Sequence, residues 1–121
     1  MARLLLVEDA PRLELAGRVA VQLLDGSTRG ARMTVRVVEV APEEDGVAPR
    51  PLHVHEGVGE FIWILEGRGT LHCPEGHLLA EAGQAVYVPP GERHKVVPIG
   101  SAPLRLLCAF ATGDIAARTR E

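Results

Sequence analysis

The stretch His53-Val54-His55-Glu56-Gly57-Val58-Gly59-Glu60 places two histidines one residue apart and a carboxylate five residues after the second. In an extended strand, residues i and i+2 point to the same face, so His53 and His55 project together. Glu60 would begin the strand after the intervening Gly-rich turn and can come alongside both imidazoles. Glu56 directly follows His55 and would point to the opposite face. We therefore expect Glu60, rather than Glu56, to supply the carboxylate.

A second motif downstream supplies another imidazole. Gly83 is followed after five intervening residues by Pro89, then by Gly91 and, after two further intervening residues, by His94. A set of three histidines and one carboxylate leaves two positions of an octahedral ion open to water, dioxygen or a substrate. The sequence thus predicts a site for one divalent transition metal (Fe, Mn, Ni, Co, Cu or Zn). Its predicted ligands are His53, His55, Glu60 and His94.

The two motifs, from His53 to Gly67 and from Gly83 to His94, resemble in order and distance the two conserved motifs of the cupin superfamily. This resemblance covers roughly residues 34–110 and implies an all-β fold, the double-stranded β-helix or jelly-roll barrel. The family's opening glycine falls at Val47 here, and an asparagine often found after the last histidine is Pro98. Neither position provides a ligand, so the metal site is expected to be intact.

The strand pattern outside the motifs agrees with this fold class. Short β-branched segments alternate with Gly/Pro turns at a spacing of about ten residues, as in sandwiches and barrels. Residues 31–40 alternate regularly, which predicts a half-buried strand, whereas residues 13–24 fit either a strand or a helical face. We expect the Glu66-Gly67-Arg68-Gly69 segment to form a tight hairpin turn. We divide the chain into an N-terminal strand or arm (1–30), the barrel (31–112) and a polar C-terminal tail (113–121).

The strand that begins at Glu60 has one consequence for assembly. If Glu60 faces inward, Ile62 and Ile64 do so too, and the apolar side chains that face outward are those of Phe61, Trp63 and Leu65. Large apolar residues on an outer sheet face usually mark a covered surface. We expect a homodimer to cover this face; the alternative is that residues 1–30 cover it within one chain.

Composition and charge limit the partners and the cellular compartment that we expect for this protein. The formal net charge is −3 and the arginines are scattered, so we expect no nucleic-acid partner. The apolar run Leu4–Val7 is too short for a signal peptide or a membrane span, and we expect no membrane partner. Cys73 and Cys108 lack a C-x-x-C spacing and are interpreted as small buried hydrophobes. These features favour the cytoplasm.

The predicted site favours a metal-dependent enzyme that acts on a small-molecule substrate, either dioxygenase-like or isomerase/lyase-like. The alternative is a non-enzymatic module that binds or senses a small ligand or metal. The remaining polar residues give weaker expectations. Tyr87 lines the pocket mouth or packs in the sheet. The other groups are expected at the surface or rim: His72, His77, Arg36, Arg50 and Arg93, although the arginines could attract an anionic substrate.

Overall fold

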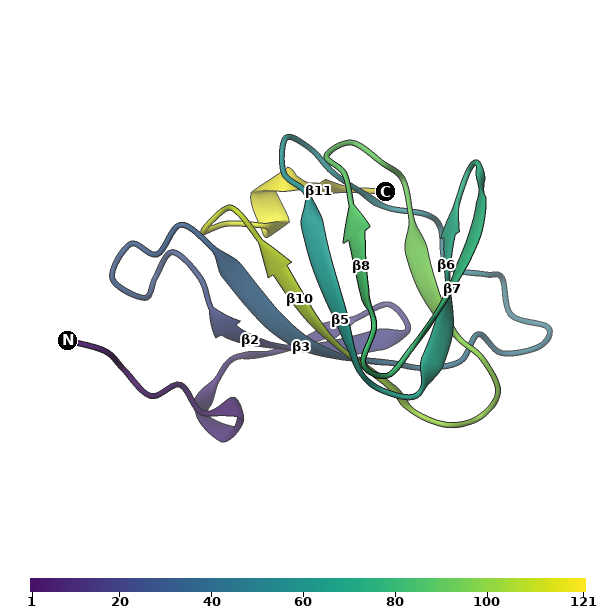
Figure 1. The fold of residues 1–121 in the computed structure, drawn as a ribbon, viewed down its shortest axis with the longest axis horizontal. Coiled ribbons are helices and arrows are strands. Elements are labelled where there is room, and N and C mark those ends of the chain that lie inside the picture. Colours follow the sequence, from purple (N-terminus) through teal and green to yellow (C-terminus); the bar gives the residue numbers. More distant parts are fainter.

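The computed structural model of the protein describes residues 1–121, and its regular secondary structure is almost entirely β-strand (Figure 1). In chain order the strands are β1 (Arg12–Leu15), β2 (Arg18–Leu24), β3 (Thr34–Val40), β4 (Val54–His55), β5 (Glu60–Glu66), β6 (Arg68–Cys73), β7 (Gly76–Glu81), β8 (Ala85–Val88), β9 (Lys95–Pro98), β10 (Leu104–Phe110) and β11 (Thr119–Arg120). The helical elements are two 3-10 turns, η1 (Val7–Asp9) and η2 (Ala116–Arg118). Neither has the length and apolar character that crossing a membrane requires.

The strands form three antiparallel sheets. A six-stranded sheet has the order β1-β2-β3-β10-β5-β8, a three-stranded sheet the order β7-β6-β9, and β11 pairs with β4. Strands that are distant in sequence lie side by side, since β10 is hydrogen-bonded to both β3 and β5. Figure 1 shows the sheets curving around a common interior. The predicted all-β jelly-roll barrel is confirmed.

The interior is aliphatic, with Phe110 its one aromatic side chain. Ile62 and Ile64 on β5 are almost completely buried. Their partners in the register are inward-facing too: Ile62 lies opposite Cys108, and Ile64 opposite Leu106 on β10. Burying an isoleucine side chain contributes about 1.5–3 kcal/mol, so this pair of strands holds the wall from which Glu60 projects.

The predicted hairpin at Gly67 is wrong. The strands on either side of it, β5 and β6, belong to different sheets, and the chain turns a corner between the sheets there. Gly67 has a φ of +79°, and a Cβ on it would lie 2.3 Å from the carbonyl oxygen of Pro103. The glycine is therefore required both by its backbone conformation and by the close approach of the 98–103 loop.

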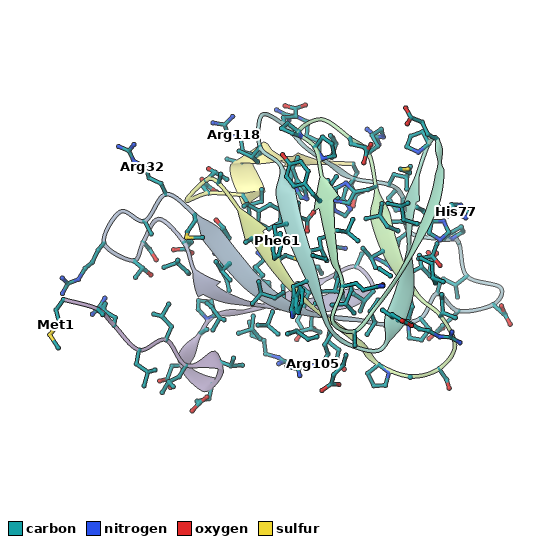
Figure 2. All side chains as sticks on the ribbon, in the orientation of Figure 1. Met1, Arg32, Phe61, His77, Arg105 and Arg118 are labelled. Carbon is teal, nitrogen blue, oxygen red and sulfur yellow. The ribbon has the colours of Figure 1, made fainter.

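The N-terminal segment extends the larger sheet. Residues 13–24, which fitted either a strand or a helix, form parts of β1 and β2, and β2 pairs with β3. The residues before β1 leave the barrel as an arm that includes η1 (Figure 1). This arm does not cover the outer face of β5, where Phe61 is 44% and Trp63 38% exposed. Figure 2 shows Phe61 on that face.

The C-terminal segment returns to the barrel. Ile115 is 1% exposed and belongs to the core, and it is the one large apolar residue of the segment 113–121. Beyond it, β11 pairs with β4 through Thr119 opposite His55 and Arg120 opposite Val54. The segment expected to be a polar tail thus lies beside a predicted ligand, and it does so because one apolar residue anchors it.

Candidate metal centre

The four predicted ligands converge at one point inside the barrel. One donor atom from each of His53, His55, Glu60 and His94 lies within 4.8 Å of the others. His55, Glu60 and His94 are buried, and His53 is partly exposed. The ring centroids of His53 and His94 are 4.4 Å apart, and His55 lies 5.0 Å from His53. Residues from the two sequence motifs are therefore brought together as expected.

Backbone hydrogen bonds join the two motifs. His53 and His94 exchange both of their backbone bonds, with N···O distances of 2.9 and 2.8 Å. The amide of Gly91, which has a φ of +78°, donates to the carbonyl oxygen of His55 at 3.0 Å. A positive φ is inexpensive only for glycine, so Gly91 lets the 89–92 turn close onto β4. Glu60 enters from β5, where it lies opposite Phe110 on one side and Val88 on the other.

Hydrogen bonds at the far side of two rings determine which nitrogen carries a proton. His94 Nδ1 lies 2.9 Å from the carbonyl oxygen of Glu92, which can only accept, so Nδ1 is the protonated nitrogen. The hydroxyl of Thr119 donates to the carbonyl oxygen of Ile115 at 2.8 Å. It must therefore accept from His55 Nδ1–H, 2.9 Å away. In the neutral form, both rings present an Nε2 lone pair to the centre of the cluster.

These lone pairs face the Glu60 carboxylate. His94 Nε2 is 2.8 Å and His55 Nε2 3.1 Å from Glu60 Oε1. Two lone pairs aimed at a carboxylate repel it, unless protons or a cation lie between them. The donor set therefore fits a cation that is shared by the imidazole nitrogens and the carboxylate oxygen. Mixed N/O donors of this kind suit a divalent transition metal.

Burial and the contacts within the cluster shift the pKa values of its side chains. Burial would raise the pKa of Glu60, but the close contacts with His55 and His94, which become hydrogen bonds when a proton lies on either Nε2, outweigh burial and lower that pKa well below its usual range. Burial, together with the nearby His94, lowers the pKa of His53 to about 3, so its ring stays neutral and able to donate a lone pair. Burial opposes protonation of His94 as well, but its bond to Glu60 raises its pKa overall. The centre thus contains an ionised carboxylate among imidazoles.

The cluster lies on one wall of a cavity of about 60 Å³. Apolar side chains from β3, β5 and β10 line much of it, including Val38, Ile62 and Phe110. The Phe110 ring packs edge-on against His55 at 4.9 Å. Burial and the nearby Glu60 raise the pKa of the Cys108 thiol, which therefore stays protonated, as expected for a small buried hydrophobe. Both cysteines are free.

The same cavity is lined by Arg18, Arg36 and Arg50, although we expected Arg36 and Arg50 to be surface charges. Arg93 is exposed outside the cavity and donates to the carbonyl oxygen of Leu52. The expectation of surface positions is therefore wrong for two of the three arginines. Sequence reasoning missed Arg18 altogether, since it is the polar member of an alternating strand and such residues ordinarily face water.

The other polar residues lie away from the centre. Tyr87 is exposed on the outer face and packs over Gly59, whose Cβ would lie 2.4 Å from the tyrosine hydroxyl. His72 and His77 form a cross-strand pair with ring centroids 4.1 Å apart. His77 lies at the outer edge of the β6–β7 hairpin (Figure 2). Glu56 points outward and pairs with Arg120 at 2.9 Å, as its place after His55 predicts.

Comparison with known proteins agrees with the fold. The chain belongs to the cupin family, since the family model described as "Cupin domain" matches residues 36–110. A relative in Methanocaldococcus jannaschii, the uncharacterized protein MJ1618, is 39% identical over 57 residues. That match covers 47% of this chain and 46% of the relative, so the chain spans about half the length of the curated protein it matches.

Solved structures with the same fold include three enzymes. A variant of oxalate decarboxylase from Bacillus subtilis has a TM-score of 0.77 and 22% identity over 95% of this chain, which spans 30% of the decarboxylase chain. Streptomyces Pac13, described as a nucleoside dehydratase, has a TM-score of 0.79 and 16% identity, and the match covers 99% of this chain and 90% of Pac13. The polyketide cyclase RemF from Streptomyces resistomycificus has a TM-score of 0.75 and 22% identity, with 94% and 81% covered. At these identities the likeness establishes the fold alone.

Proposed function

We propose that this chain is a metal-dependent enzyme for a small molecule, and that His53, His55, Glu60 and His94 are the ligands of one divalent transition metal. The observation that carries the proposal is the orientation of the His55 and His94 lone pairs toward the Glu60 carboxylate. When bound, the ion would supply either oxygen activation, as in a dioxygenase, or Lewis-acid polarisation of a carbonyl, as in an isomerase or lyase.

The chain itself supplies binding, orientation and exclusion of water. Thr119 and the Glu92 carbonyl fix the two rings, so that the Nε2 atoms of His55 and His94 point inward. Ile62 and Phe110 give the cavity an apolar wall beside the cluster, which limits the entry of water. Apart from the cluster, the titratable side chains that line the cavity are arginines and the Cys108 thiol, and none of them is suited to act as a general base at neutral pH. The chemistry is therefore assigned to the metal centre.

The same lack of a separate base favours a second candidate, a non-enzymatic module that binds a small ligand or the metal itself. Metal content, measured by mass spectrometry on protein purified without added metal or an affinity tag, is the first test of both. We expect about one metal ion per chain, and loss of most of it in His55→Ala. His77→Ala, which removes an exposed imidazole outside the cluster, should retain full occupancy. Full occupancy in His55→Ala would refute the ligand assignment.

Turnover then separates the two candidates. Iron-dependent oxygen consumption, or metal-dependent conversion of an organic acid, sugar or nucleoside, would establish the enzyme. The solved enzymes of the same fold support this outcome, because they are a decarboxylase, a dehydratase and a cyclase. Tight binding of metal with no turnover of any of these substrate classes would favour the binding module.

We further propose that two chains pair through the outer face of β5 and β8, in the reducing environment of the cytoplasm. Phe61, Trp63 and Tyr87 are exposed on this face, and Phe61 and Tyr87 are cross-strand neighbours. Trp63→Glu should halve the mass measured by light scattering, from twice the 13.0 kDa of one chain to a single copy. Val47→Glu, at an exposed loop position elsewhere, is the control. A wild-type protein that is monomeric at micromolar concentration would refute the pairing.

A further inference from the structure

Three arginines line the cavity that contains the histidine cluster. Arg18 comes from β2, Arg36 from β3 and Arg50 from the loop before β4, so residues far apart in the chain meet at one site. None of the three has a carboxylate oxygen within 4.0 Å. Half-buried arginines are ordinarily paired, because a buried charge without a partner is costly.

Each guanidinium is held by one neutral acceptor. Arg36 Nε donates to Gln22 Oε1 at 2.9 Å, Arg18 Nη1 to the carbonyl oxygen of Ala16 at 3.0 Å, and Arg50 Nη2 to that of Val96 at 2.8 Å. A guanidinium has five N–H donors, so most of them remain available. These bonds orient the three groups without neutralising their charge.

Contacts of the Arg50 backbone hold this residue in place, and they leave its guanidinium charge unpaired. The buried Lys95 donates to both Glu43 carboxylate oxygens, at 2.9 and 3.2 Å, and to the carbonyl oxygen of Arg50 at 2.8 Å. Glu43 in turn accepts from the backbone amide of Arg50 at 2.6 Å. Gly17 leaves room for the side chain, since a Cβ there would lie 2.5 Å from Arg50 Cδ. The loop is thus fixed by a lysine–glutamate pair, and the guanidinium is directed to the cavity.

The charge balance of the cavity is positive. Glu60 is the one carboxylate that lines it, against three arginines, and a bound divalent ion would add to the surplus. Burial, and repulsion from Arg18, lower the pKa of Arg36, so these positive groups are close enough to oppose each other. An anion that enters the cavity would relieve this repulsion and satisfy the free N–H donors.

The size of the cavity limits the anion. One water requires about 10–15 Å³ of such volume, so a cavity of about 60 Å³ holds on the order of four to six non-hydrogen atoms. That is the size of a small organic acid such as glycolate. A larger ligand would need the cavity to open.

We propose that the cavity binds a small carboxylic acid, with its carboxylate on Arg18, Arg36 and Arg50 and an adjacent oxygen directed to the histidine cluster. The second contact rests on the metal site of the proposed function, whereas the first does not. The arginines therefore select the charged end of the substrate, and the metal centre acts next to that end.

Titration by NMR tests this inference on the zinc-loaded protein, because zinc is diamagnetic. Glycolate should shift the Nε–H resonances of Arg18, Arg36 and Arg50, and glycolamide, its neutral analogue, should not. Arg18→Gln or Arg36→Gln should weaken glycolate binding at least about tenfold, the usual scale for a lost charged hydrogen bond. Arg68→Gln makes the same charge change at an exposed position outside the cavity and should bind within about twofold of wild type. The backbone spectrum of each variant reports whether it is folded.

The outcomes separate this inference from the proposed function. Equal binding of glycolate and glycolamide, or unchanged affinity in folded Arg18→Gln and Arg36→Gln, would overturn the inference even if one metal ion is bound. If the protein takes up no metal, the same titration of the metal-free protein still tests the arginines. Arginine-dependent glycolate binding there would support the inference, while the metal-dependent function would fail.

Discussion

Thr119→Val should weaken metal binding although Thr119 is not among the proposed ligands. Its hydroxyl accepts from His55 Nδ1–H at 2.9 Å and donates to the Ile115 carbonyl oxygen at 2.8 Å. Valine has nearly the same shape, so the substitution removes both hydrogen bonds without leaving a large cavity. His55, which is buried, then has an Nδ1–H without a partner. The ring can rotate or change its tautomer, which turns the Nε2 lone pair away from the cluster.

The size of the effect follows from these contacts. An unsatisfied buried donor costs about 1–3 kcal/mol of folding stability. Loss of a hydrogen-bond partner behind a metal-ligating histidine typically weakens metal binding by about 10–100-fold. Thr119→Ser retains the hydroxyl and should restore most of the affinity. Thr70→Val makes the same chemical change on β6, away from the cluster, and should leave metal binding unchanged.

Two measurements check this prediction. Competition with a chromophoric chelator gives the zinc affinity, and the nitrogen chemical shifts of the imidazole give the tautomer of His55. We expect wild type and Thr119→Ser to carry the proton on Nδ1, and Thr119→Val to lose that preference. If Thr119→Val binds zinc within about twofold of wild type, the reasoning from ring orientation is refuted. A large loss in Thr70→Val would show instead that the effect is a general loss of stability.

Two further predictions concern the fold around the site. Gly67→Ala should lower the free energy of unfolding, measured in urea, by more than about 2 kcal/mol, because a Cβ there would lie 2.3 Å from a backbone oxygen and the φ is positive. The control is Gly100→Ala, which has a similar φ but open space around it and should lower the free energy of unfolding by about 1–2 kcal/mol. Equal losses in the two variants would contradict the argument. Burial would raise the pKa of Glu43, but hydrogen bonds from Lys95 and the Arg50 amide lower it overall, below its usual value of 4.5. The stabilisation from the Glu43–Lys95 pair is therefore present above pH 4.5 and lost as the pH falls through the lowered pKa of Glu43. Wild type should be more stable than Glu43→Gln at neutral pH and should lose this advantage in acid. A stability difference that does not change with pH would rule out the ion pair as its source.

The convergence of His53, His55, Glu60 and His94 was predictable because each of the two motifs carries a local signal. His53 and His55 lie on one face of a strand as a direct result of the two-residue period, and the turn glycines mark where the chain reverses. The resemblance to a known family added the distance between the two motifs. The alternating pattern of β5 was equally informative, since Ile62 and Ile64 are buried and Phe61 is exposed as expected.

The pairing of strands was harder to predict from the sequence. A tight turn after β5 predicted a hairpin, yet β5 pairs with β8 and β10 and not with the strand that follows it. Local turn chemistry is the same for a hairpin and for a corner between sheets, and long-range packing decides between them. Thr119 was missed for a related reason. It lies in a polar segment whose only strong signal for docking is a single buried residue, Ile115.

The rule that polar residues of an alternating strand face water fails for the arginines of the cavity, and the failure has a physical cause. On β2, Arg18, Ala20 and Gln22 share one face and Val19 and Val21 the other. Reading polar as outward would place Arg18 in water, whereas it lines the cavity. The rule fails because this barrel holds a polar site in its interior and must place polar side chains there.

The outward face of the same sheet is apolar in compensation. Phe61 and Trp63 on β5 are exposed there, while the next residues along the strand, Ile62 and Ile64, fill the core. Large apolar side chains that stay exposed on an outer sheet face usually mark a surface that another molecule covers. The proposed pairing of two chains would bury Phe61 and Trp63, while the cavity on the other side of the sheet is lined by Arg18 and Arg36. A monomeric protein would leave the outer face of this sheet without that explanation, even if the arginines bind the acid as proposed.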